Sequence, residues 1–204
     1  RVAAARAAVL RAPRRSLHAR VRGFAGTRPA LLLAFGWGAA EALVWPIVPD
    51  LLVAALALAA PRRAIPIAAA AVAGSVAGGL AAYGLGALGA AGVLDHVPLV
   101  TGRMQAEAAS RMTTDGAAGV LGQPWSGIPF KVFAYQAPAA GVDAGAFAVF
   151  AFLARAVRFL QVAAMFAAGA ILLRRWIDRL YAWTLGAVLV VFYYGLSRVV
   201  AAWS

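Results

Sequence analysis

Two apolar stretches of this chain are interrupted near their middles by prolines that lie close to charged residues. In residues 30–60 the interruption is formed by Pro46 and Pro49, which stand between the acids Glu41 and Asp50. A helix in lipid must satisfy its own backbone hydrogen bonds, so such breaks persist only where protein or a wet cavity surrounds them. Broken helices of this kind commonly line the binding sites of transporters. The pattern therefore indicates a transporter-like membrane protein.

The second interrupted stretch, residues 116–141, carries Pro124, Gly127 and Pro129 shortly before Lys131. Two crossings of a bilayer need roughly 40 residues and one needs about 20, so both stretches are too short for two crossings. Their prolines make them poor single crossings. A single crossing here would also separate the C-terminal arginine cluster from the N-terminal one, against the tendency of basic residues to stay on one side. We therefore predict a re-entrant hairpin of two half-helices in each stretch.

The rest of the chain is apolar enough to lie in a membrane. Hydrophobic residues make up 64 % of the sequence and charged residues 13 %, whereas a soluble domain has about 25 % charged residues. Three apolar runs, 64–94, 144–173 and 180–204, reach the roughly 20 residues that a transmembrane helix needs. The predicted fold class is an all-α polytopic membrane protein.

The sequence carries no signature of an enzyme or of a metal site. It has no cysteine, which excludes disulfides and thiolate chemistry. His18 and His96 lie far apart and form no ligand motif. The sequence motifs of serine hydrolases and zinc proteases are absent. We expect no catalytic activity, no cofactor and no bound metal.

The net charge of +12 could suggest nucleic acid as a partner, but its placement argues otherwise. Eight arginines fall within residues 1–28, with no acid among them. A basic segment directly before the first apolar stretch is typical of a cytoplasmic arm that faces anionic lipid. Residues 1–28 are predicted to be such an arm, either as a topology signal or as a lipid-binding segment.

The predicted elements form two similar units joined by a connector. Charges of alternating sign recur every four residues along this connector, which indicates an amphipathic helix at the membrane interface. Because the two units would enter from opposite sides, they would form an inverted repeat, an architecture that places a site near the midplane. The predicted membrane domain, 29–175, contains hairpin 30–60, span 64–94, connector 98–115, hairpin 116–141 and span 144–173, and a C-terminal transmembrane helix follows in 176–204.

Three short motifs carry a family resemblance. They are Glu41…Pro46…Pro49-Asp50, the glycine-rich run Gly74…Gly78…Tyr83-Gly84, and Ile128-Pro129-Phe130-Lys131 followed by Ala140-Gly141. They resemble the DedA family, also called the VTT-domain or SNARE-associated membrane proteins. The Pro-Phe-Lys-Val version, with Arg155 and Arg158 in the next helix, is most similar to the YqaA-like branch. Gln123 departs from the pattern, because many members carry an arginine near this position. The resemblance implies two re-entrant hairpins and the flipping or scrambling of phospholipids or polyprenyl-phosphate carriers in the bacterial inner membrane.

Lys131 is the only lysine of the chain and would lie in the first turn of the half-helix that follows Pro129. A cation there opposes the helix dipole unless an anion joins it. Free N–H groups at a helix start together with an ammonium group make a phosphate site. In the alternative, the side chain simply extends to the membrane interface.

Arg155 and Arg158 stand three residues apart and share one face of their predicted span. An unpaired arginine at such depth costs at least about 2.5–3.5 kcal/mol, so both need partners. Glu41 and Asp50 are the acids at comparable depth, although Asp50 could instead cap the half-helix that follows it. In one interpretation these four charges neutralise each other and lock the two halves together. In the other, the arginines and Lys131 share a phosphate headgroup, and the acids serve as counter-ions or in proton coupling.

The function that these features favour is a membrane transporter, a flippase or scramblase for lipids with phosphate-bearing headgroups. Proton coupling through Glu41 or Asp50 is a further hypothesis. The expected partners are membrane lipids and not nucleic acid, and the small-residue surfaces permit a homo-oligomer without demanding one. Two alternatives stay open: a proton- or cation-coupled transporter of a small solute, and a non-catalytic membrane scaffold.

Overall fold

The computed structural model describes residues 16–203, which form helices and turns without a strand. Most of the predicted basic arm, residues 1–15, lies outside this range, and the rest of the arm forms the first helix. The elements in chain order are α2 (Leu17–Ala25), α3 (Arg28–Leu43), α4 (Asp50–Ala59), η1 (Pro61–Arg63), α5 (Ala64–Ala87), η2 (Ala90–His96), α6 (Gly102–Asp115), η3 (Gly116–Gly122), α7 (Gln123–Ser126), α8 (Phe130–Gln136), α9 (Ala144–Leu172) and α10 (Ile177–Trp203).

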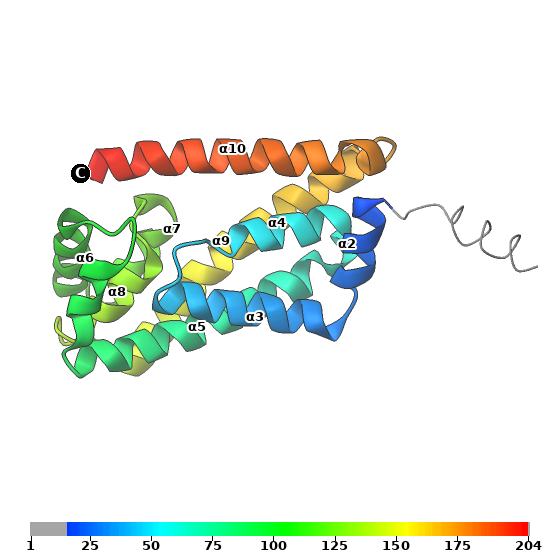
Figure 1. Cartoon of the computed structure of the whole chain (residues 1–204). Helices are drawn as coiled ribbons and strands as arrows, with labels where there is room; N and C mark the ends of the chain where they lie inside the picture. Colours follow the sequence, from blue (N-terminus) through cyan, green and yellow to red (C-terminus); the bar gives the residue numbers. More distant parts are fainter. Residues whose placement is uncertain (1–15, 204) are drawn as a thin grey trace, which may run out of the picture.

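Three helical segments are long and apolar enough to cross a membrane: Pro61–Ala87, α9 and α10. They run roughly along the long dimension of the molecule (Figure 1). The all-helical class and the three long apolar helices are confirmed. The predicted end of the first span at residue 94 is too late, because α5 stops at Ala87. Gly89 adopts a left-handed φ of 80°, which ends the helix, and the tighter η2 follows.

The first proline-broken stretch forms two antiparallel helices with an irregular turn between them. The helix α3 ends at Leu43 and α4 begins at Asp50, so the break spans the two prolines. Prolines lack the N–H group that would continue a helix. The indole Nε1 of Trp37 donates a hydrogen bond of 2.9 Å to the Ile47 carbonyl oxygen, which holds the turn against α3. In Figure 1 the chain enters and leaves this pair of helices at the same end of the molecule.

The second broken stretch is more irregular than the two half-helices that the sequence predicts. Its first arm consists of η3 and the four-residue α7, and its second arm is the seven-residue α8. The break lies at Gly127, whose φ of 74° is left-handed, and at Pro129. This stretch lies beside α6, at the end of the molecule opposite α2 (Figure 1).

The helix α5 is the centre of the packing, because it contacts α3, α9 and α8. Glycines allow α3 and α5 to approach until backbone touches backbone. A Cβ atom on Gly74 would overlap the carbonyl group of Phe35, and one on Gly78 would overlap that of Ala39. The glycine-rich run of α5 is therefore a packing surface, and it fixes α3 on the body of the protein.

We predict that Gly74→Ala destabilises the protein by about 1–3 kcal/mol, because its methyl group forces α3 and α5 apart. Gly84→Ala on the same helix is the matched control, since nothing lies within 4 Å of a Cβ there. Alanine also favours a helix over glycine, so the control is expected to be neutral or slightly stabilising. Thermal unfolding in detergent measures both variants. Equal melting temperatures would contradict the close packing of α3 on α5.

Candidate functional site

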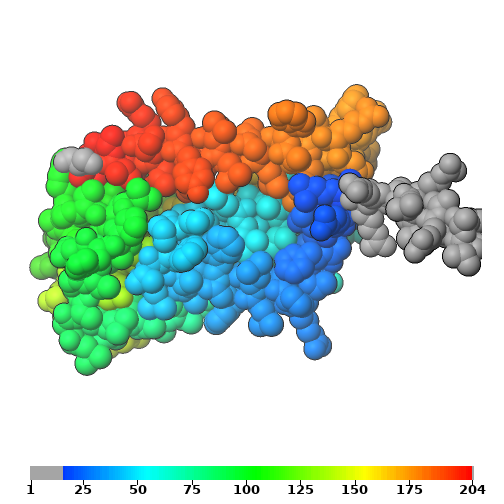
Figure 2. All heavy atoms as spheres, viewed as in Figure 1, coloured from blue at the N-terminus to red at the C-terminus, as the bar shows by residue number. Residues whose placement is uncertain are grey.

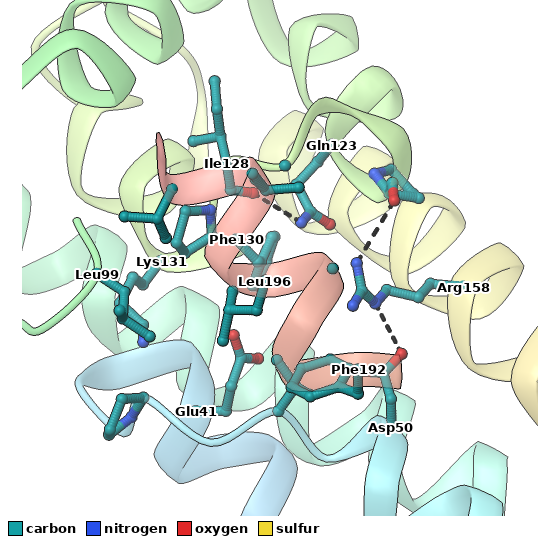
Figure 3. A pocket seen from close by; sticks show the side chains of 18 of the residues that line it. Glu41, Asp50, Leu99, Gln123, Ile128, Phe130, Lys131, Arg158, Phe192 and Leu196 are labelled. Carbon is teal, nitrogen blue, oxygen red and sulfur yellow. Dashed lines mark hydrogen bonds and ion pairs between the residues drawn. The ribbon is translucent and has the colours of Figure 1, made fainter. Parts of the chain in front are cut away.

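A cavity of about 380 Å³ lies where the two broken stretches meet α9, and α10 closes one side of it (Figure 3). All five charged residues singled out in the sequence line it: Glu41, Asp50, Lys131, Arg155 and Arg158. Of the predicted break residues, Pro46, Pro124, Gly127 and Pro129 line it as well, whereas Pro49 stands one residue before α4 and is not among the lining residues. Residues from five separate segments thus converge on one space: 41–50, 98–104, 123–131, 155–158 and 191–200.

Arg155 is the most deeply buried of these charges. Its Nη2 donates a hydrogen bond of 2.8 Å to Oε2 of Glu41, and the two residues are only 2 % and 4 % exposed. The guanidinium lies over the rings of Phe130 and Phe159, with centroid distances of 5.0 and 4.6 Å. Aromatic faces attract a cation, most strongly away from water. The pair joins α3 to α9 across the middle of the protein.

Arg158 follows one turn later on α9 and pairs with the other acid. Its Nε donates to Oδ1 of Asp50 at 2.8 Å, and its Nη1 donates to the carbonyl oxygen of Pro124 at 3.4 Å (Figure 3). The side chain is 25 % exposed. Asp50 is the first residue of α4 and does not cap it, so the capping alternative is wrong. Its second oxygen, Oδ2, is buried and has no hydrogen-bond partner among residues 16–203.

Lys131 lies in the first turn of α8 and does not extend to the surface, since it is 2 % exposed. Its Nζ donates a hydrogen bond of 2.7 Å to the carbonyl oxygen of Trp45. That oxygen belongs to the break after α3, where the helical hydrogen bonds stop. In the described part of the chain, no carboxylate forms an ion pair with Lys131.

The cavity therefore contains three cationic and two anionic side chains, and both acids already pair with an arginine. The formal net charge of these five side chains is +1, and the ammonium group of Lys131 donates its hydrogen bond to a neutral carbonyl. A buried charge is costly unless it is paired. The arrangement suits one additional negative charge next to Lys131.

Several contributors to the site were missed in the sequence. The side-chain amide of Gln123 donates to the Ile128 carbonyl at 3.0 Å, and its oxygen accepts a 3.5 Å hydrogen bond from Nη1 of Arg155. Gln123 thus supports the buried arginine. The indole of Trp37 supports the other break. The apolar run in the middle of α10 offered no signal that this helix closes the cavity.

Comparisons with protein-family models, with curated proteins and with solved structures gave no match. Among the described residues there is also no group of three or more side chains that could hold a metal ion.

We predict that Glu41→Gln lowers the free energy of unfolding by about 3–5 kcal/mol, because it leaves Arg155 buried without a counter-charge. The control is Glu107→Gln, which removes the partner of Arg111 in a half-exposed pair on α6. Such surface pairs contribute about 0–1 kcal/mol. Unfolding in mixed detergent micelles measures the loss of free energy of unfolding in each of the two variants. Similar losses would mean that the buried pair does not hold α3 to α9.

Proposed function

We propose that this chain is a membrane transporter that moves lipids with phosphate-bearing headgroups across the bilayer, as a flippase or scramblase. The observation that carries the proposal is the buried excess cation, Lys131, in a cavity built where two broken helical segments meet. A phosphate oxygen beside this ammonium group would supply the missing negative charge. The cavity of about 380 Å³ accommodates a headgroup, while the hydrocarbon chains stay in the bilayer.

In this proposal the two broken stretches are re-entrant hairpins of an inverted repeat. The α3–α4 pair and the η3–α8 segment approach the cavity from opposite ends of the molecule (Figure 1). Irregular backbone at membrane depth is tolerated only where protein or a wet cavity surrounds it, and both breaks line the cavity. The motifs that resemble the DedA family support the same architecture and the same lipid substrates.

The arrangement of arginines supports an orientation with the N-terminal arm in the cytoplasm. Helix α2, the α4–α5 connection and the α9–α10 connection lie at one end of the molecule (Figure 1). Eight exposed arginines belong to this end: Arg20, Arg22, Arg28, Arg62, Arg63, Arg174, Arg175 and Arg179. Basic residues stay preferentially on the cytoplasmic side of a membrane. Together with the family resemblance, this favours a bacterial inner membrane.

The ion pairs give the proposal a mechanism. A phosphate would contact Lys131 first. The partly exposed Arg158 could then release Asp50 and bind the phosphate, and because one anion replaces another, the guanidinium would never be left without a counter-charge. Protonation of Asp50 would favour this exchange, because a neutral carboxyl group binds a guanidinium more weakly. The more deeply buried pair of Arg155 and Glu41 would keep the two halves together throughout the cycle.

We predict that Lys131→Met reduces lipid exchange at least tenfold in proteoliposomes. The readout is the exposure of labelled phospholipid or polyprenyl phosphate to a membrane-impermeant quencher. Methionine keeps the length of the side chain but removes its charge, so the phosphate loses its first partner. Arg63→Met, an exposed arginine at the opposite end of the molecule, is the control and is expected to exchange lipid at the native rate.

Native rates for Lys131→Met would contradict the phosphate site. An absence of exchange by the folded native chain would contradict lipid transport and favour the solute transporter or the scaffold.

The same assay tests proton coupling, because Asp50→Asn is expected to abolish any dependence of the rate on pH.

The hairpin topology predicts which ends of the helices share a side of the membrane. The chain lacks cysteine, so single cysteines can be introduced at exposed positions without background. Ala106→Cys on α6 and Ala144→Cys at the start of α9 are expected to react with an impermeant maleimide from the same side. Arg175→Cys is expected to react from the other side. Opposite sides for positions 106 and 144 would mean that residues 116–141 cross the membrane once.

A further inference from the structure

One side of the cavity is formed by a single helix, α10. Its contribution is aliphatic and aromatic, with a single glycine: Val191, Phe192, Gly195, Leu196, Val199 and Val200. In Figure 3 this helix passes in front of the charged side chains, with Phe192 and Leu196 on the side of the cavity. All the charged side chains of the cavity therefore come from the body of the protein, together with apolar ones such as Leu99 and Phe130, whereas α10 contributes no charge.

The N-terminal end of α10 is firmly attached to the body. Ile177 and Tyr181 are buried there, and the Tyr181 hydroxyl donates a hydrogen bond of 2.9 Å to the Ala55 carbonyl on α4. Oδ1 of Asp178 lies 2.7 Å from Nδ1 of His18 on α2. The turn that joins α9 to α10 adds a covalent connection at the same end. This end can serve as the fixed point of a moving helix.

The rest of α10 is attached much more weakly. None of the described residues after Tyr181 is buried. In the most apolar part of the helix 0 % of the residues are buried, compared with 50 % for Pro61–Ala87 and 28 % for α9. At its far end, Thr101 donates a hydrogen bond of 3.1 Å to the Trp203 carbonyl, and Val199 lies against Gly127. Figure 2 shows this half of α10 lying along the outside of the molecule, beside α6.

We propose that α10 is a lateral gate of the cavity. It pivots about its attachment at Asp178 and Tyr181, and its C-terminal half separates from the turn between α7 and α8. This inference rests on the proposed function, because it specifies how a lipid reaches Lys131. The open gate exposes the charged wall to the edge of the bilayer, so an anionic headgroup can enter while its chain stays in contact with α10. A water-soluble solute does not need such an opening.

The gap between α10 and the second break fits a disulfide that would hold the gate closed. A Cβ atom placed on Gly127 would lie 3.8 Å from Cβ of Val199, within the range of about 3.5–4.5 Å found in disulfides. It would crowd Cγ1 of Val199 at 2.6 Å, but the substitution of Val199 removes that atom. Because the chain has no cysteine of its own, no other pair competes.

The test is lipid exchange by the Gly127→Cys/Val199→Cys variant, measured before and after reduction with dithiothreitol. We expect the oxidised form to exchange lipid at least tenfold more slowly than the reduced form. Val199→Cys alone is the control and should not respond to oxidation. Equal rates for the oxidised and reduced double variant would overturn the gate and leave the lipid site in place.

A second measurement does not depend on transport or on the strain of a cysteine at Gly127, where φ is 74°. Spin labels on Leu121→Cys in η3 and Tyr194→Cys in α10, both at exposed positions, report the distance across the gate in a bilayer. We expect two distance populations, with the longer one corresponding to the open gate. A single narrow population would overturn the gate, whereas two populations without lipid exchange would support the gate and contradict the proposed function.

Discussion

The buried ion pair between Arg155 and Glu41 is the interaction on which the rest of the site depends. It joins residues 114 positions apart in the sequence and places the first broken stretch against α9. A guanidinium in an apolar interior is tolerated only with a counter-charge and further contacts, which the rings of Phe130 and Phe159 supply. Because Phe130 begins α8, the same arginine also brings the second broken stretch to this point.

The helix breaks explain why the cavity is polar. Where a helix stops inside a protein, its carbonyl groups need donors from elsewhere. Each break here receives such donors from side chains. The pairs are Lys131 with Trp45, Trp37 with Ile47, Arg158 with Pro124, and Gln123 with Ile128. Three of these donors, Lys131, Arg158 and Gln123, line the cavity, so they are also side chains that a ligand would meet.

The molecule combines a tightly packed body with one loosely attached helix. Glycines on α5 allow direct backbone contact with α3, and α5 also packs against α9. In contrast, α10 contributes apolar side chains to the cavity but buries few of its own residues. The charged side chains of the body face an uncharged helix across the cavity, an arrangement suited to an amphiphilic substrate, because its headgroup and its hydrocarbon chain each meet a matching surface.

The sequence by itself determined the all-helical class, the three long apolar helices and the positions of the breaks, since these follow from local composition and from proline chemistry. It also singled out the charged residues, because charges are costly in apolar segments. The three-dimensional structure was needed to show that Arg155 pairs with Glu41 and Arg158 with Asp50, that Lys131 forms no contact ion pair with a carboxylate of residues 16–203, and that α10 closes the cavity. The physical reason is that ion pairing depends on the relative register of helices far apart in sequence. The long apolar run of α10 likewise carries no pattern to indicate which of its faces is covered.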